Sequence, residues 1–459
     1  MLRPAADVDA AYFEALRARE FARLDAHDLA YLDYTGSALY SASQLARYSQ
    51  LLAEGVFGNP HSEHAPSQES SDLIADARQA TLAHFGVNAD THAVCFVANA
   101  SAAIKLVAES YAFGPQRGLI LSADNHNSVN GIREYAGRAG ARVDVLPLDG
   151  TLRLDDPQAR LLAAMRGDGG LLAFPALSNF SGVKHPLALI DTAHSQGWDV
   201  LLDAAAYAAT NPLDLRQHPA DFAVFSFYKM FGLPTGGGAL IARRDALARL
   251  ARPWFAGGTV EFASVQHRRH LLRAGAEGFE DGTPNFLGIG AVSGGYDFLR
   301  QVGHARVGAR VCALTAQFLD RLGALHHADG APLVKVYGPG AGADRGATVA
   351  FNLLRRDGRC VPYTEVEARA RSAGVSLRGG CFCNPGAAEV AFGFEAAATA
   401  RCLDTLHDGF SVARFTDCLG PRAAVGALRV SFGMASTVAD LDRATNLITQ
   451  YAAAAIAAA

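Results

Sequence analysis

Short apolar runs alternate with amphipathic stretches between about residues 90 and 245, and this alternation limits the possible folds more than any other feature. A strand that is apolar on both faces, followed by a helical stretch, is the repeating unit of a parallel sheet covered by helices. We therefore predict an α/β fold with a mainly parallel sheet. The expected strands are residues 92–98, 118–123, 142–148, 169–175, 198–203, 220–225 and 236–242.

A change in this pattern along the chain predicts two domains around one site. Residues 41–300 hold the alternating runs and are expected to form a large domain. After about residue 300, longer helical stretches are broken by a glycine-rich turn at residues 338–346. Residues 301–459 are therefore expected to form a smaller α+β domain, and residues 1–40 to pack with it.

Composition excludes several classes of protein. Half of the 459 residues are hydrophobic, which is enough for a full core, and the net charge of -4 is spread without the basic stripe that binds nucleic acid. No apolar run approaches membrane-spanning length, and the acidic N-terminus does not resemble a signal peptide, so we expect a cytoplasmic protein without a membrane or nucleic-acid partner. The seven cysteines, an odd number, favour reduced thiols over a disulfide framework.

Polar side chains follow five of the expected strands, directly after each strand ends. In open α/β sheets, ligands bind beyond the carboxyl ends of the strands, so these side chains are expected to share one rim and one site. The residues are Asn99, Ser101, His126, Asn179, Asp203, Ser226 and Lys229.

Lys229 is one of only four lysines, and it lies between a buried strand and a glycine-rich stretch. A lysine placed there leaves water and its amine pKa falls, as imine formation with an aldehyde cofactor requires. Asp203 precedes it by 26 positions and could pair with a protonated pyridine nitrogen. The alternatives are an ordinary surface lysine and a helix-capping aspartate.

Other residues could complete a cofactor site. Ala100 and Ser101 open a helix whose free N–H groups and hydroxyl could hold a phosphate, although a plain capping serine is the commoner explanation. His126 could lie flat on a cofactor ring, and Asn179 could contact a ring hydroxyl or a substrate carboxylate. Arg429 stands inside an apolar run, where it needs either a bidentate carboxylate or a structural salt bridge.

Cys381 and Cys383 follow Arg378 and two glycines. A mobile glycine-rich loop beside a cation favours a thiolate, so a nucleophile is expected here. Half of a metal site is the alternative, but no second Cys/His pair at zinc spacing occurs in the sequence, and no metal is predicted.

Taken together, these residues resemble the fold-type I pyridoxal phosphate (PLP) enzymes of the class V aminotransferase group, and within it the cysteine desulfurases. Nearly the whole chain shares the resemblance, and three segments are most similar to the aminotransferase-like domain of molybdenum cofactor sulfurases: residues 226–236, 279–283 and 380–387. The motifs shared with the wider family are residues 31–33 (YLD), 58–62 (GNPHS), 203–205 (DAA), 226–229 (SFYK) and 281–285 (DGTPN).

The resemblance implies that pyridoxal 5'-phosphate is the cofactor and that Lys229 holds it as a Schiff base. Asp203 would contact the pyridine nitrogen, His126 would stack on the ring, and Ser101 and Ser226 would bind the phosphate. Thr283 would reach the phosphate of a neighbouring subunit, which implies a homodimer. The full set of expected cofactor-binding residues is Lys229, Asp203, His126, Ser101, Ala100, Ser226, Tyr228 and Thr283.

The resemblance also implies a substrate site and a nucleophile. Asn179 and Arg429, assisted by Arg378, would hold the substrate carboxylate, and Cys383 would attack the substrate sulfur, with Cys381 as the alternative thiol. Lys229, Cys383 and His126 would be the catalytic residues. Two departures from ordinary desulfurases concern the cofactor: Ala206 stands where a glutamine is usual, and Tyr228 replaces a histidine.

The implied reaction converts L-cysteine to L-alanine and leaves a persulfide on the enzyme. Full sulfurases of eukaryotes resemble this chain joined to a C-terminal domain, so the sulfur acceptor is expected to be a separate molecule, with molybdenum cofactor as one candidate. The alternatives are an aminotransferase, a selenocysteine lyase or a carbon-sulfur lyase, because one scaffold hosts all of these reactions. A non-catalytic scaffold that relays sulfur is a further alternative.

Overall fold

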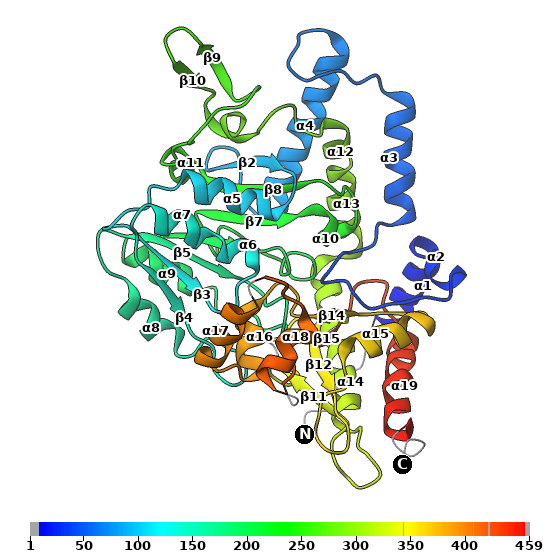
Figure 1. Cartoon of the computed structure of the whole chain (residues 1–459). Coiled ribbons are helices and arrows are strands. Elements are labelled where there is room, and N and C mark those ends of the chain that lie inside the picture. Colours follow the sequence, from blue (N-terminus) through cyan, green and yellow to red (C-terminus); the bar gives the residue numbers. More distant parts are fainter. Residues whose placement is uncertain (1–8, 343, 407, 421–422, 455–459) are drawn as a thin grey trace.

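The computed structural model describes residues 9–342, 344–406, 408–420 and 423–454, and its largest sheet has seven strands (Figure 1). This sheet, with the helices that cover it, is called the large domain below. Its strand order is β2-β8-β7-β6-β5-β3-β4, and only β8 runs antiparallel to its neighbours. The predicted mainly parallel α/β fold is therefore confirmed. The strands are β2 (His92–Val97), β3 (Gly118–Ser122), β4 (Val143–Leu146), β5 (Gly170–Pro175), β6 (Asp199–Asp203), β7 (Phe222–Ser226) and β8 (Gly238–Arg243).

Both faces of this sheet are buried, because successive side chains of a strand point to opposite faces. In β2, Val94 and Phe96 belong to one core and Ala93 and Cys95 to the other. Helices α5 (Ala100–Ser110) and α7 (Ile132–Arg138) supply the second core. The first core is larger and includes side chains of α4 (Ala65–His84), α8 (Pro157–Ala164), α9 (Leu189–Ser195) and α13 (Val292–Val302).

A smaller antiparallel sheet in the order β11-β12-β15-β14 lies beside the large domain (Figure 1). Its strands are β11 (Val334–Tyr337), β12 (Thr348–Leu353), β14 (Arg378–Gly380) and β15 (Ala427–Ser431). The N-terminal part of the chain joins it, because β1 (Ala30–Tyr31) pairs with β13 (Val375–Ser376) and Asp33 bridges to Ser431. The helices of this region are α14 (His304–Gly323), α15 (Tyr363–Ser372), α16 (Pro385–Phe392), α17 (Ala396–Thr405), α18 (Val412–Leu419) and α19 (Val438–Ala454).

The remaining elements are mostly short, and two of them stand away from the sheets in Figure 1. The hairpin of β9 (Val260–Ser264) and β10 (Arg269–Leu272) projects from the large domain, and α3 (Ala42–Glu54) runs along its side. No described helix is long and apolar enough to cross a membrane. The others are α1 (Ala10–Glu20), α2 (Arg23–Ala26), α6 (Asn127–Asn130), α10 (Phe227–Phe231), α11 (Arg244–Ala248), η1 (Gly275–Phe279) and α12 (Phe286–Gly290).

The prediction that all cysteines are reduced thiols is wrong for two of them. Cys402 of α17 and Cys418 of α18 form a disulfide. The two helices pack through Leu406 and Phe415, which brings these cysteines together across a separation of 16 residues. An odd total allows such a pair, and the other five cysteines are free.

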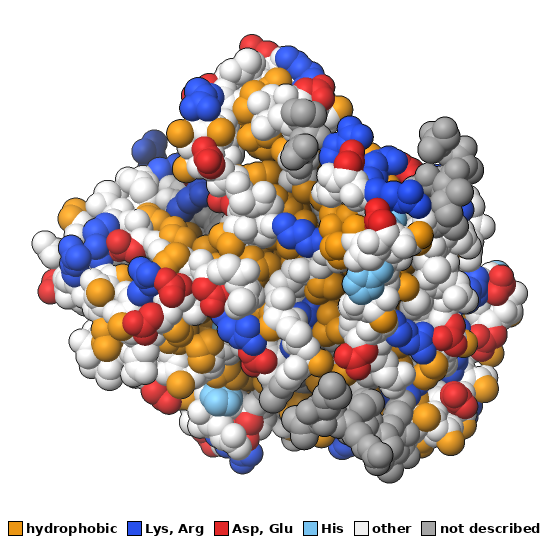
Figure 2. Space-filling view, turned by 90° about the horizontal axis from the view of Figure 1, so that it is seen from below, with side chains coloured by type: hydrophobic (Ala, Val, Ile, Leu, Met, Phe, Trp, Pro, Cys, Tyr) orange, Lys and Arg blue, Asp and Glu red, His pale blue; other side chains and the backbone are white. Residues whose placement is uncertain are grey.

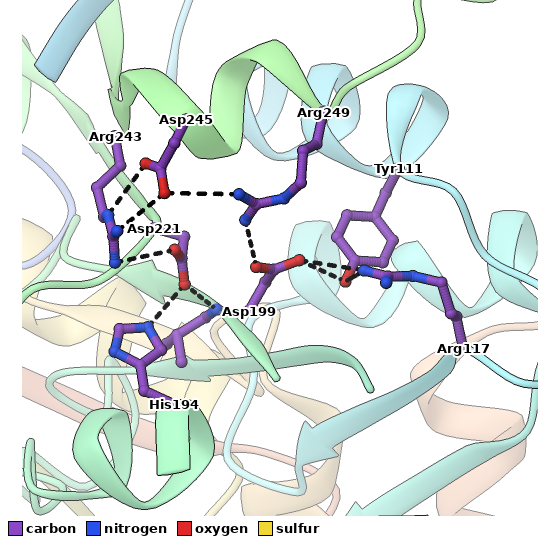
Figure 3. Close-up of polar contacts among 9 residues, drawn as sticks. Tyr111, Arg117, His194, Asp199, Asp221, Arg243, Asp245 and Arg249 are labelled. Carbon is purple, nitrogen blue, oxygen red and sulfur yellow. Dashed lines mark hydrogen bonds and ion pairs between the residues drawn. The ribbon is translucent and has the colours of Figure 1, made fainter. Parts of the chain in front are cut away.

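Charged side chains of both signs are mixed over the face shown in Figure 2. A denser polar network lies at the amino end of β6, opposite the carboxyl ends of the parallel strands (Figure 3). There Asp199 accepts from Arg249 (2.6 Å) and Tyr111 (2.8 Å), and buried Asp221 pairs with His194 (2.8 Å). This hydrogen bond raises the pKa of His194. The network ties together strand β6, helix α9 and the end of β8 far from the site described next.

Candidate active site

A cavity of about 420 Å³ opens beyond the carboxyl ends of the parallel strands. Its walls are formed by residues that end or follow several different strands. Such a cavity is where α/β sheets bind ligands. Of the predicted cofactor and substrate residues, eight line it: Ala100, Ser101, His126, Asn179, Asp203, Ser226, Tyr228 and Lys229.

Lys229 lies in α10, directly after β7, and forms part of the cavity wall. Burial lowers the pKa of its amine, and the nearby carboxylate of Asp203 opposes this effect. Because imine formation needs a neutral amine, this environment suits the chemistry predicted for Lys229. Asp203 ends β6, is 8% exposed, and accepts a hydrogen bond from the N–H of Ala205 (2.9 Å).

The first turn of α5 forms one edge of the cavity. Asn99 caps the helix by accepting from the N–H of Ala102 (3.0 Å), and Ser226 accepts from the N–H of Ala100 (2.9 Å). Ser101 shares a 2.6 Å hydrogen bond with Ser128. Hydroxyl groups at a helix N-terminus are a suitable phosphate site.

Two residues at this edge were missed in the sequence. Ser128 and Thr235 both line the cavity. Ser128 donates its N–H to the ring Nδ1 of His126 (3.1 Å), which caps α6. The sequence signal was the short spacing between His126 and Ser128, which is typical of a side chain that caps a helix. Burial lowers the pKa of His126, which favours a neutral ring over the cavity.

Arg378 and Arg429 meet at Asp33, a contact that the sequence did not predict. Arg429 Nη2 lies 2.8 Å from Asp33 Oδ1, and Arg378 Nη2 lies 2.7 Å from Oδ2. The salt bridge considered for Arg429 therefore exists. Its Nη1 also donates to the carbonyl of Asn179 (3.1 Å), while its buried Nε has no partner among the described residues. Arg429 does not itself line the cavity, but it contacts Asn179, which does, and within the described part of the chain its Nε keeps one unused donor.

The two candidate thiols differ in their surroundings. Cys383 is exposed, whereas Cys381 is half-buried and its Sγ donates to the carbonyl of Val425 (3.1 Å). Burial raises the pKa of the Cys381 thiol. Since the thiolate is the nucleophile, Cys383 is the better candidate.

Thr283 lies outside this cavity, in a neighbouring pocket of about 330 Å³. Asn59 donates to its hydroxyl at 3.4 Å. Its contact with a second subunit, and the homodimer itself, stay predictions. Among the described residues, no group of three or more His, Cys, Asp or Glu side chains is arranged to hold a metal ion.

The fold defines the class of protein, which is the fold-type I architecture predicted from the sequence. Solved structures with this fold include a cysteine desulfurase of Thermococcus onnurineus (TM-score 0.79, 21% identity, 96% of this chain and 98% of that one). A cysteine desulfurase of Escherichia coli is also similar (TM-score 0.76, 22% identity, 96% and 98%). Residues 30–444 match the aminotransferase class-V family, and the chain belongs to it.

Curated relatives are more similar in sequence to the chain than these solved structures are. The chain is 36% identical to a molybdenum cofactor sulfurase of Solanum lycopersicum, over 95% of this chain and 56% of that protein. It is 35% identical to the molybdenum cofactor sulfurase of Homo sapiens, over 93% and 50%. The chain thus spans about half the length of these relatives, and the resemblance seen in the sequence motifs is confirmed.

Proposed function

We propose that this protein is a PLP-dependent enzyme that takes sulfur from L-cysteine, releases L-alanine and holds the sulfur as a persulfide on Cys383. The observation that carries the proposal is an exposed thiol close to a cavity that contains an amine of lowered pKa, with a buried arginine bonded to Asn179 of the cavity wall. These are the three groups that the reaction needs: a nucleophile, a base and an anchor for the carboxylate.

The cavity suits PLP in its donor set. Lys229 would hold the aldehyde carbon, Asp203 the pyridine nitrogen, and the α5 edge with Ser101, Ser128 and Ser226 the phosphate. When bound, this group supplies an electron sink for carbanion chemistry at the substrate α-carbon. The buried carboxylate of Asp203 is well placed to favour the protonated form of a pyridine nitrogen.

The residues of the chain have separate tasks in the reaction. Asn179 and Arg429, assisted by Arg378, would orient the substrate carboxylate, and the amine of Lys229 would take the α-proton. The Cys383 thiolate would then attack the substrate sulfur, so that a sulfur–sulfur bond forms while the carbon–sulfur bond breaks. The electron pair of the broken bond ends on the β-carbon, which is protonated to the methyl group of alanine. No external oxidant is required.

The proposed acceptor is a separate molecule, and the sulfurase relatives make molybdenum cofactor the first candidate. The substrate itself is proposed to be free L-cysteine. A homodimer is proposed because Thr283 lies outside the cavity of its own chain.

Replacement of each thiol in turn tests the proposal. Cys383→Ser should abolish protein-bound persulfide, detected by mass spectrometry, and lower alanine formation from cysteine by at least about 100-fold. Cys381→Ser is the matched control and should retain both. Unchanged alanine formation in Cys383→Ser would contradict the proposal and favour a lyase reaction. Transfer of the amino group to a keto acid would instead indicate an aminotransferase.

A further inference from the structure

We propose that Asp124 and Asn384 form a buried clamp that positions Cys383 at the rim of the cavity. Asp124 lies after β3 in the large domain, and Asn384 is the residue after Cys383. The inference rests on the proposed role of Cys383 and identifies the groups that hold it in place. Both are positioning residues, because their side chains contact the loop and not the cavity.

The loop that carries Cys383 has an unfavourable backbone conformation at two residues. Phe382 and Cys383 are consecutive residues with φ angles of 54° and 56°. Side chains other than glycine rarely adopt this left-handed region, and two in succession are costly. A free loop would relax, so the surrounding structure must stabilise this conformation.

Two donors of the large domain hold the carbonyl groups of these strained residues. Asn179 Nδ2 donates to the carbonyl of Phe382 (2.7 Å), and the N–H of Asn127 donates to the carbonyl of Cys383 (2.7 Å). The guanidinium of Arg429 lies 4.8 Å from the centre of the Phe382 ring. The loop is therefore attached to the rim next to His126 and the candidate carboxylate site.

Asn384 connects this attachment to the core. Its side chain is fully buried, and Nδ2 donates to Asp124 Oδ1 (2.7 Å) and to Asn179 Oδ1 (3.0 Å). The second bond also fixes the amide of Asn179, whose Nδ2 holds Phe382. The Oδ1 of Asn384 accepts from the N–H of Ala387 (3.2 Å) and so caps α16. One side chain thus fixes both the loop and the helix that follows it.

Asp124 is the acceptor on which the clamp depends. Its carboxylate receives Ser178 Oγ (2.8 Å) and His185 Nε2 (2.7 Å) in addition to Asn384. The side chains of Asp124 and His185 have no solvent exposure. A buried carboxylate is stable only when hydrogen-bond donors surround it. The loss of Asn384 as a donor would therefore destabilise Asp124 and weaken its other hydrogen bonds.

At the start of α16, the backbone of Gly386 lies in close contact with the backbone of Ala123 in the large domain. A Cβ atom at Gly386 would lie 2.1 Å from the carbonyl oxygen of Ala123, next to Asp124. Glycine at this position therefore permits the docking of the loop, and alanine would push it away without altering any polar group of the clamp.

Asn384→Asp is the sharpest test, because it keeps the volume and the helix cap but places a carboxylate against Asp124. Hydrogen exchange followed by mass spectrometry should show about tenfold faster exchange in residues 378–392 and at Asn127. In the PLP-loaded enzyme, kcat for alanine formation should fall about 10- to 100-fold while PLP content stays near wild type, and this fall should exceed any rise in KM for L-cysteine that the altered contact with Asn179 causes. Gly386→Ala should give the same pattern and serves if Asn384→Asp does not fold.

Two further variants complete the design. Asn211→Asp is the matched control: its buried Nδ2 also donates twice, to Tyr207 and Thr210, away from the loop, so it should leave the exchange of residues 378–392 unchanged. The double variant Asp124→Asn/Asn384→Asp restores a donor facing an acceptor and should recover part of the protection and of kcat.

The outcomes separate the clamp from the proposed reaction. Unaltered exchange in residues 378–392 of both Asn384→Asp and Gly386→Ala would overturn the clamp. Equal loosening in Asn211→Asp would also overturn it, because the effect would then be general destabilisation. A wild-type protein that forms no alanine would refute the proposed function, whereas the exchange data, which need no turnover, would still decide on the clamp.

Discussion

Replacement of Asp33 by asparagine tests how the two arginines are held. Asp33 is the shared partner of Arg429, which is 3% exposed, and of Arg378, which is half-exposed. Removal of one partner of a buried ion pair costs about 3–5 kcal/mol, whereas an exposed pair contributes about 0–1 kcal/mol. Because asparagine keeps one acceptor for Arg429, we expect Asp33→Asn to lower the free energy of unfolding by about 3 kcal/mol, the low end of that range.

The assay is reversible urea unfolding of the cofactor-free protein, followed by circular dichroism, with two double-mutant cycles. Pairing Asp33→Asn with Arg429→Gln should give a coupling energy of about 2–3 kcal/mol. Pairing it with Arg378→Gln should give less than about 1 kcal/mol. Equal coupling in the two cycles, or a total loss below about 1 kcal/mol for Asp33→Asn, would refute the reasoning from burial.

Two other predictions concern regions away from the cavity. The hydrogen bond to Asp221 raises the pKa of His194, so it stabilises the fold below the ordinary histidine pKa of about 6.5 and less as the pH rises through the folded-state pKa. The stability difference between wild type and His194→Gln should thus shrink between about pH 6 and pH 9; a difference independent of pH would contradict this. Cys418→Ser, which opens the disulfide with Cys402, should cost about 2–3 kcal/mol and speed hydrogen exchange in residues 396–419. Unchanged exchange there would contradict it.

The strands of the large domain were predictable because they are buried on both faces and therefore appear in the sequence as continuous apolar runs. Lys229 and Asp203 were predictable for a related reason: both follow such runs and so had to lie on one rim. The short strands β1, β13 and β14 carry no such signal, because they have only two or three residues each.

The contacts that the sequence could not reveal are those between distant segments. Asp33 was visible only as part of a motif, and its pairing with Arg429 depends on how the N-terminal segment enters the small sheet. Asp124 and Asn384 are separated by 260 positions, and nothing in their neighbours indicates that they meet. The disulfide was missed because two cysteines 16 residues apart meet only when their helices pack.

Asp33 binds Arg429 although the two residues are 396 positions apart in the sequence. The chain could therefore be cut between them into two fragments that must associate to restore this contact. A break at Val265, the 95% exposed residue in the β9–β10 turn, would leave Asp33 and Lys229 on one piece and Cys383 and Arg429 on the other. Neither fragment would contain all the residues of the proposed active site. With pyridoxal phosphate as the proposed coenzyme, colour should form on the first piece alone, while the proposed sulfur release should return only on mixing, so that reassembly itself becomes the measured event.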